Sequence, residues 1–345
     1  MQILVDKSIK YFKDLVIEIS NLKNIKFVYY DSHKITNKNI QEYDGLLVRA
    51  HTSVNKSLLF NSDIKFIGSA TSGINHIDHD YLKKSDISFF NCSGSNSASV
   101  VNYVASAISI LIKKKVIPTN FKLGIIGYGN IGKKLETFFQ TRQISVIVYD
   151  PFLDHDHLVD FELIKNCDVV SLHVPLTKHG RYPTFNLINE SFINEFEGKV
   201  IINTSRGNIL NEELLLLNKN IKYICDTWSN EPEPSCKSII KSFVSTPHIA
   251  GHSFDGKLNA TKDLILYLTN FLRIDVKESE LVNIRDFKKN NTNKFKSFDE
   301  FIPSYNIEKE SDDFKKLSKK FENKVSETAF KKIRSKHPFR RDVIK

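Results

Sequence analysis

Three residues in the second half of the chain have side chains suited to the oxidation of an alcohol. Histidine titrates near neutral pH, so His248, in TPHIAG, is the natural base for a hydroxyl proton. Glu231, in DTWSNEP, can orient that ring and favour the imidazolium that forms. Arg206, in NTSRG, offers a planar fork for a carboxylate. Together they predict oxidation of a 2-hydroxy acid, with the hydride passing to a nicotinamide.

Each of these residues also has an ordinary structural explanation. A single His after a strand is usually structural, an Arg before Gly usually lies in a surface turn, and Glu-Pro often ends an element. Their order, downstream of a nucleotide motif, favours a joint catalytic role.

The predicted cofactor site is a glycine-rich turn after an apolar strand at 123–126. Gly127 allows a tight turn, Gly129 lets a pyrophosphate approach the backbone, and Gly132 lets the next helix pack closely on the strand. The phosphates would lie at the N-terminus of that helix, where unpaired N–H groups point outward. The cofactor contacts predicted here are Gly127, Tyr128, Gly129, Asn130, Ile131 and Gly132.

Asp150 directly follows the next predicted strand, at 144–149. A carboxylate at this distance from the glycines can accept hydrogen bonds from the adenosine ribose. Pro151 and Phe152 follow it, with no adjacent Arg to bind a 2′-phosphate. The segment therefore predicts NAD in preference to NADP.

The chain alternates short apolar strands with helical segments, a pattern typical of parallel α/β sheets. In the first 95 residues, strands are predicted at 3–5, 26–30, 45–49, 65–69 and 87–91, and a helix at 12–22. A buried helix at 96–112 precedes strands at 123–126, 144–149, 168–173, 199–203, 221–225 and 243–245. Polar clusters follow the later strands, so Asp226 and the three catalytic candidates should converge at one sheet edge.

Length and composition indicate a globular protein of two or three domains. The chain has 345 residues, 41% hydrophobic and 26% charged. Its formal charge of +10 comes from Lys residues that are spread along the chain rather than clustered, so we expect no nucleic-acid partner.

Four cysteines without metal-ligand spacing predict free thiols and no metal site. Neither an export signal nor a membrane-spanning stretch is visible, so we expect a cytoplasmic protein with no membrane partner.

The motifs GYGNIG, NTSRG, DTWSNEP and TPHIAG, together with the strand-terminal Asp150, resemble the D-2-hydroxyacid dehydrogenases in their order. The resemblance covers Met1 to about Arg285. It implies Arg206 as the carboxylate binder, Glu231 as the partner of His248, and His248 as the acid/base. Further cofactor contacts are expected from Val174, Thr204, Ser205, Arg206, Asp226 and Gly251, with Asp226 facing the nicotinamide end.

A narrower resemblance is to the members of this family that oxidise 4-phospho-D-erythronate in pyridoxine biosynthesis. It is carried by MQILVDKSI, VRAHTSVNKSLL, ATSGINHID and ASVVNYV, by a short connection at 112–122, and by LTKHGRYPTFNLI. The implied reaction oxidises the C2 hydroxyl and gives 2-oxo-3-hydroxy-4-phosphobutanoate and NADH.

The loops after the strands at 45–49 and 65–69 are candidate substrate contacts, because ligands gather beyond the carboxyl ends of such strands; ordinary polar turns are the alternative. The predicted substrate contacts are Arg49, Ala50, Thr71, Gly73 and His252. Ala50 stands where these relatives commonly have Ser, His252 where they have Tyr, and Asn102 where they have Glu. Arg49 is the candidate for the substrate phosphate.

The expected fold is α/β: a Rossmann-type doubly wound parallel sheet, a flavodoxin-like α/β substrate domain, and a shortened C-terminal α+β dimerisation domain. The substrate domain is predicted at 1–95, completed by 252–284, and the NAD-binding domain at 96–251. Residues 285–345 would form the dimerisation domain of a homodimer, with 330–342 resembling its family counterpart and a mobile linker at 288–296.

Two other functions remain open. The first is a dehydrogenase for D-3-phosphoglycerate or another D-2-hydroxy acid, since phosphoglycerate also carries a phosphate and a carboxylate. The second is a non-catalytic, NAD-sensing protein resembling the transcriptional corepressors that share this scaffold.

Overall fold

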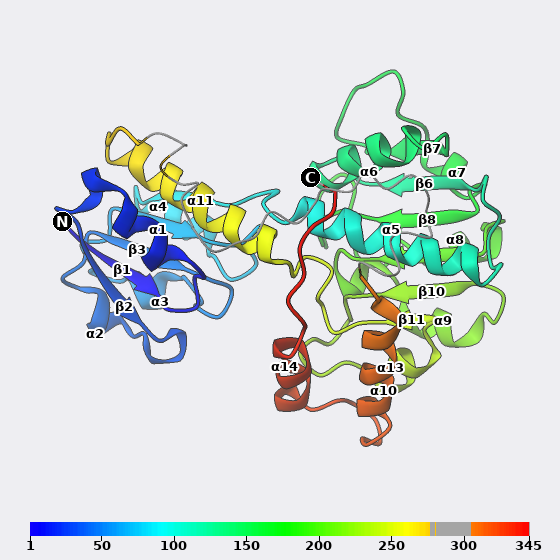
Figure 1. Ribbon diagram of the computed structural model, residues 1–345. Helices are drawn as coiled ribbons and strands as arrows, with labels where there is room; N and C mark the ends of the chain where they lie inside the picture. Colours follow the sequence, from blue (N-terminus) through cyan, green and yellow to red (C-terminus); the bar gives the residue numbers. More distant parts are fainter. Residues whose placement is uncertain (277–279, 281–304, 345) are drawn as a thin grey trace. The chain divides into compact units, whose positions relative to one another are not determined.

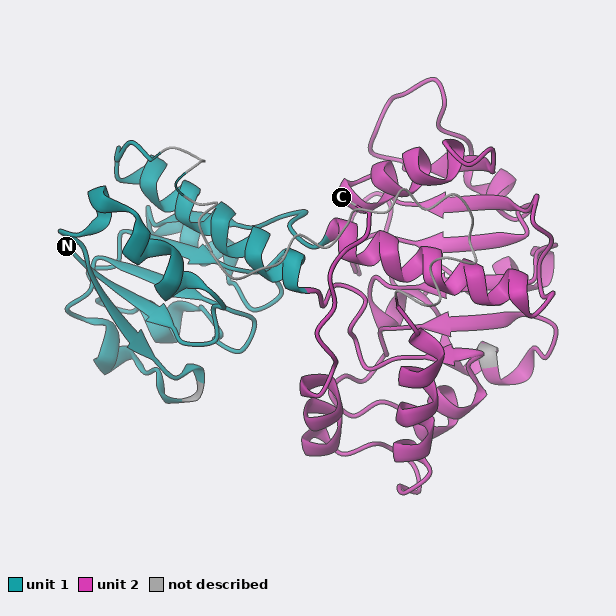
Figure 2. Cartoon of the chain, viewed as in Figure 1, with its two compact units in different colours: residues 1–96, 254–291 teal, residues 97–253, 292–345 magenta. Residues whose placement is uncertain are grey.

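The computed structural model describes residues 1–276, 280 and 305–344, and the chain forms two compact units (Figures 1 and 2). Unit 1 comprises Met1–Asn96 and Phe254–Asn291, and unit 2 comprises Ser97–Ser253 and Thr292–Lys345. The linker predicted at 288–296 lies outside the described residues. Each unit is built on its own parallel sheet.

The sheet of unit 1 has the order β2-β1-β3-β4-β5, and every pairing in it is parallel. This is the strand order of flavodoxin-like folds, as predicted. The strands are β1 (Gln2–Asp6), β2 (Lys26–Tyr30), β3 (Gly45–Val48), β4 (Phe66–Ser69) and β5 (Ser88–Asn91). The helices are α1 (Phe12–Glu18), α2 (Asn37–Ile40), α3 (Lys56–Leu59), α4 (His79–Lys84) and α11 (Phe254–Phe271), with short 3-10 turns at Ser20–Leu22 and Ser32–Lys34.

Side-chain alternation along β1 divides the core of unit 1 between two faces of the sheet. Ile3 and Val5 pack in one cluster with Leu264 of α11, whereas Leu4 packs in another with Ile40 of α2. The strands are therefore buried on both sides, which explains their almost continuous apolar sequences.

The predicted helix at 12–22 was too long. The α-helix ends at Glu18, because Ile19 adopts an extended conformation, and a separate 3-10 turn follows. Ile19 and Leu22 are nevertheless buried, so the apolar pattern reported burial correctly but not helical continuity.

Unit 2 contains a parallel sheet with the order β11-β10-β9-β8-β6-β7. Its strands are β6 (Lys122–Ile126), β7 (Ser145–Tyr149), β8 (Val169–Leu172), β9 (Val200–Asn203), β10 (Lys222–Cys225) and β11 (Val244–Ser245). The strand order reverses at β6, which carries the glycine turn, and this is where doubly wound sheets bind ligands. The helices are α5 (Ser97–Lys113), α6 (Asn130–Gln140), α7 (Phe161–Ile164), α8 (Glu190–Glu195), α9 (Glu212–Leu217), α10 (Cys236–Lys241), α13 (Ile307–Ser318) and α14 (Glu327–Ser335), with a 3-10 turn at Gly207–Ile209.

The described C-terminal residues belong to unit 2. Phe314 of α13 and Phe330 of α14 share a buried cluster with Trp228 and Ile239. In the part of this region that the structure describes, 305–344, there are helices and no strand. The predicted dimerisation role of this region stays a prediction.

The four cysteines, Cys92, Cys167, Cys225 and Cys236, are free and buried, which confirms the predicted thiols. Among the described residues, no helix has the length and apolarity needed to span a bilayer.

Candidate active site

The glycine turn after β6 has the geometry of a nucleotide loop. Gly127 has φ +101°, and a Cβ there would lie 2.7 Å from the carbonyl oxygen of His173. A Cβ at Gly132 would lie 2.1 Å from the carbonyl oxygen of Gly127. Both positions therefore require glycine, one for the turn and the other for the close approach of α6.

Gly129, by contrast, has open space around it. Apart from its neighbours in the chain, no described atom lies within 4 Å of the position its Cβ would take, and this residue is the N-cap of α6 without a side-chain cap. Gly129 therefore leaves room for an anion at the N-terminus of α6, where helices favour negative charge. These residues fit the pyrophosphate of NAD.

Asp150 follows β7 and is held beside the same turn. Its Oδ2 accepts a hydrogen bond from the Tyr128 N–H at 2.9 Å, and its Oδ1 accepts one from the Phe152 N–H at 3.1 Å. A carboxylate oxygen can accept a second hydrogen bond, so this group is oriented yet still able to bind ribose hydroxyls. The Tyr128 hydroxyl donates to Glu136 at 2.5 Å, which, with burial, raises the pKa of Tyr128 to about 12.

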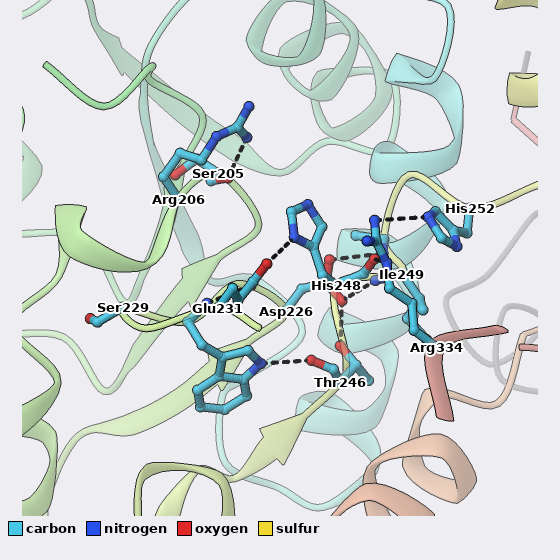
Figure 3. A network of polar contacts seen from close by, with 12 residues as sticks. Ser205, Arg206, Asp226, Ser229, Glu231, Thr246, His248, Ile249, His252 and Arg334 are labelled. Atoms are coloured by element: carbon cyan, nitrogen blue, oxygen red, sulfur yellow. Dashed lines mark hydrogen bonds and ion pairs between the residues drawn. The ribbon is translucent and has the colours of Figure 1, made fainter. Parts of the chain in front are cut away.

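His248 and Glu231 form a directed pair. The His248 Nδ1 lies 2.6 Å from Glu231 Oε2, and the second oxygen of Glu231 accepts a hydrogen bond from the Trp228 N–H at 2.8 Å (Figure 3). Burial raises the pKa of Glu231, but His248 and the Trp228 N–H outweigh it, so this pKa lies below its ordinary value. The carboxylate is therefore ionised and accepts the Nδ1 proton, which leaves Nε2 of His248 for a substrate.

The loop that carries His248 is fixed by Asp226. The Asp226 carboxylate accepts hydrogen bonds from the Thr246 hydroxyl at 2.6 Å and from the N–H groups of Ile249 and Ala250 at 2.7 and 2.8 Å. Its main-chain oxygen accepts the His248 N–H at 2.8 Å. These bonds hold His248 at φ 57°, a left-handed conformation that is costly for a residue with a side chain. The predicted contact of Asp226 with nicotinamide stays a prediction.

Arg206 follows β9, in a segment that packs closely against the segment containing Glu231. A Cβ at Gly207 would lie 1.9 Å from the main-chain carbon of Trp228, so the NTSRG and DTWSNEP segments touch there. The guanidinium donates to the Ser205 carbonyl at 2.7 Å, and burial lowers the Arg206 pKa while Glu231 raises it. It has no ion pair with a described carboxylate within 4.0 Å, so a substrate carboxylate can occupy that place.

The other cofactor candidates of unit 2 lie at the ends of neighbouring strands. Thr204 and Ser205 follow β9, and Val174 lies two residues beyond β8, directly after His173. His173 was missed by the sequence analysis: its ring lies 2.8 Å from the Ser171 hydroxyl and 3.4 Å from that of Thr204, and burial lowers its pKa to about 3. It is therefore a neutral side chain supporting this sheet edge. Gly251 lies in the loop that carries His248, three residues after it.

The remaining substrate candidates lie in unit 1, beyond the carboxyl ends of β3 and β4, where they were predicted. Arg49 donates to the carbonyl of Ser8 at 3.1 Å, and Ala50 follows it. The Thr71 hydroxyl donates to the carbonyl of Gly73 at 2.7 Å. Their contact with substrate stays a prediction.

Two further contacts join the surroundings of the site to the C-terminal region. Arg334 of α14 donates to the His248 carbonyl at 3.0 Å and lies 3.1 Å from the His252 ring. Asn102, one of the positions that depart from the family pattern, binds the main chain of Val343 and Ile344 through its amide. No local sequence pattern could have revealed these contacts, because their partners are more than 80 residues apart.

Known proteins are similar to this chain in sequence and in fold. Residues 114–250 match the family described as D-isomer specific 2-hydroxyacid dehydrogenase, NAD binding domain. Erythronate-4-phosphate dehydrogenase of Wigglesworthia glossinidia brevipalpis is 38% identical over 282 residues, which cover 79% of this chain and 73% of that protein. The protein of the same name from Marinomonas sp. (strain MWYL1) is 37% identical over 286 residues, covering 80% and 74%.

Solved structures agree with the fold. The NAD+-bound 3-phosphoglycerate dehydrogenase of Entamoeba histolytica aligns with a TM-score of 0.65 at 23% identity, covering 79% of this chain and 95% of that chain. A D-2-hydroxyisocaproate dehydrogenase aligns with a TM-score of 0.64 at 20% identity, covering 79% and 97%. At these identities the likeness concerns architecture alone.

Proposed function

Because this chain belongs to the D-isomer-specific 2-hydroxyacid dehydrogenase family, whose matched domain is an NAD-binding domain, we propose that this NAD-dependent oxidoreductase acts on 4-phospho-D-erythronate. The product would be 2-oxo-3-hydroxy-4-phosphobutanoate, and the predicted role in pyridoxine biosynthesis goes with this substrate. The relatives named erythronate-4-phosphate dehydrogenase support the substrate. The observation that carries the chemistry is the 2.6 Å pair of His248 and Glu231 in the same unit as the glycine turn.

His248 removes the C2 hydroxyl proton in this proposal. Its Nε2 makes no hydrogen bond to a described residue, whereas Nδ1 is committed to Glu231. When Nε2 accepts the proton, the imidazolium forms beside an ionised carboxylate, and the attraction between the two charges lowers the barrier. Bound NAD supplies the acceptor for the C2 hydride.

Arg206 holds the substrate carboxylate next to the reacting carbon. A guanidinium forms two parallel hydrogen bonds to a carboxylate, which fixes the position of C2 as well as binding it. The Ser205 carbonyl and the packing of Gly207 against Trp228 restrict where this side chain can lie.

The test is steady-state NADH formation by the purified protein with NAD and, in parallel, 4-phospho-D-erythronate and D-3-phosphoglycerate. A higher kcat/KM with the erythronate ester is expected. Faster turnover of phosphoglycerate would overturn the proposed substrate. NAD binding without NADH formation from either compound would favour the NAD-sensing protein instead.

We also infer a homodimer in the cytoplasm, from the family resemblance of 330–342 and from the dependence on NAD. Light scattering coupled to gel filtration tests the first: the mass of two chains is expected, and the mass of one chain, 39.7 kDa, would exclude it.

A further inference from the structure

Arg334 places a guanidinium beside the loop that carries His248. Its Nε donates to the His248 carbonyl at 3.0 Å, and its Nη2 lies 3.1 Å from His252 Nε2. A guanidinium only donates hydrogen bonds, so this nitrogen of His252 accepts and carries no proton. In the view of Figure 3, the His248 ring lies between the guanidinium of Arg206 on one side and that of Arg334 on the other.

Arg334 forms no ion pair with another described residue. None of the carboxylates in the described part of the chain lies within 4.0 Å of its guanidinium, and its Nη1 makes no hydrogen bond to a described residue. Burial lowers the Arg334 pKa, while Glu231 and Asp226 raise it. Because an arginine stays charged even so, a partly buried guanidinium with free N–H groups is a favourable site for a ligand anion.

Several hydrogen bonds connect the C-terminal segment around Arg334 to the loop that carries His248. His337 Nε2 lies 3.0 Å from the carbonyl of His252. Arg340 donates to the carbonyls of Ala250 and His252 at 2.8 and 3.2 Å. With Arg334 on the His248 carbonyl, basic side chains of the C-terminal segment thus bind alternate carbonyls of the loop 248–252. The guanidinium of Arg334 is therefore oriented before any ligand binds, which reduces the entropy lost on binding.

We propose that Arg334 binds the phosphate of the substrate, at the end opposite the carboxylate that Arg206 binds. This inference rests on the proposed function, whose substrate carries one anionic group on each side of the reacting carbon. It gives the C-terminal segment a role in substrate specificity within its own chain. His252, the hydrogen-bond acceptor of Arg334, then acts as a positioning residue.

The decisive experiment compares 4-phospho-D-erythronate with D-erythronate, which lacks the phosphate. Arg334→Met keeps the unbranched apolar part of the side chain and removes the charged guanidinium. We expect the preference for the phosphorylated substrate, measured as a ratio of kcat/KM values, to fall by about tenfold to a hundredfold, the effect of one charged hydrogen-bonded contact. The control is Lys332→Met, an exposed charge on the same helix, which should keep the wild-type ratio.

An equal loss with both substrates would overturn the proposal, because Arg334 would then act only through His248. If the ratio falls in Arg49→Met but not in Arg334→Met, the phosphate binds Arg49, and the proposal is overturned as well. If Arg334→Met does not fold by circular dichroism, Arg334→Lys replaces it, with a smaller fall of the same ratio expected.

A binding measurement separates this inference from the proposed function. The NAD-loaded protein is titrated calorimetrically with inorganic phosphate, and Arg334→Met is expected to weaken binding by at least about tenfold relative to Lys332→Met. Equal binding by the two variants would overturn the anion site. A wild-type protein that binds phosphate through Arg334 but does not oxidise the erythronate ester would instead refute the proposed substrate alone.

Discussion

Replacing Glu231 with Gln is expected to slow the oxidation about 30- to 150-fold at neutral pH. The variant keeps an oxygen that can accept the Nδ1 proton of His248 but removes the negative charge 2.6 Å from that nitrogen. At this separation Coulomb's law gives about 1.6 kcal/mol in bulk water and about 6 kcal/mol at an effective dielectric constant of 20. Since the two side chains are 31% and 23% exposed, we take about 2 to 3 kcal/mol, which corresponds to that range of rates.

The pH profile gives a second, independent readout for Glu231→Gln. The charge interaction with His248 is one cause of the lowered pKa of Glu231, and removing the carboxylate removes that interaction. The acid limb of the kcat/KM profile should therefore move to lower pH, even though the maximum rate falls. Initial rates of NADH formation across the pH range measure both effects.

Glu233→Gln is the matched control, because Glu233 is an exposed carboxylate of the same loop. It should retain the wild-type rate and pH profile. The reasoning is refuted if Glu231→Gln stays within about twofold of wild type with an unmoved acid limb. The pair would then be structural rather than catalytic.

The remaining predictions concern the base, the carboxylate site and the glycine turn. His248→Ala should lower kcat by at least about a hundredfold, and unaltered turnover would remove it from the mechanism. Arg206→Lys should mainly raise KM, because the bidentate fork is lost, and an unchanged rate at low substrate would count against a carboxylate contact. Gly129→Ala should weaken NAD binding by calorimetry without changing the melting temperature, whereas Gly132→Ala, whose Cβ would lie 2.1 Å from a carbonyl oxygen, should lower the melting temperature itself. Equal melting temperatures for the two glycine variants would contradict the packing argument.

Local sequence patterns determined the elements of both sheets. Each predicted strand agrees with the observed one to within a residue at both ends, because a strand is marked by an apolar run of consecutive residues between turn residues. The catalytic candidates could be proposed for a related reason: each follows a strand, and parallel strands bring their carboxyl ends to one edge. The helix at 12–22 shows where this reasoning stops, since apolar spacing reports which residues are buried and not whether the backbone remains helical through Ile19.

The tertiary structure alone decided how the loop of His248 is held. The Asp226 carboxylate binds this loop, and no spacing rule in the sequence connects the two. Arg334 lies 86 residues from His248 in sequence, and its guanidinium donates to the His248 carbonyl, a contact that the sequence did not predict. Contacts of this kind join segments distant in the chain, and their energies depend on packing that only the folded chain creates. The sequence by itself therefore determined the chemistry available to this protein, and the fold decided which charged groups surround His248.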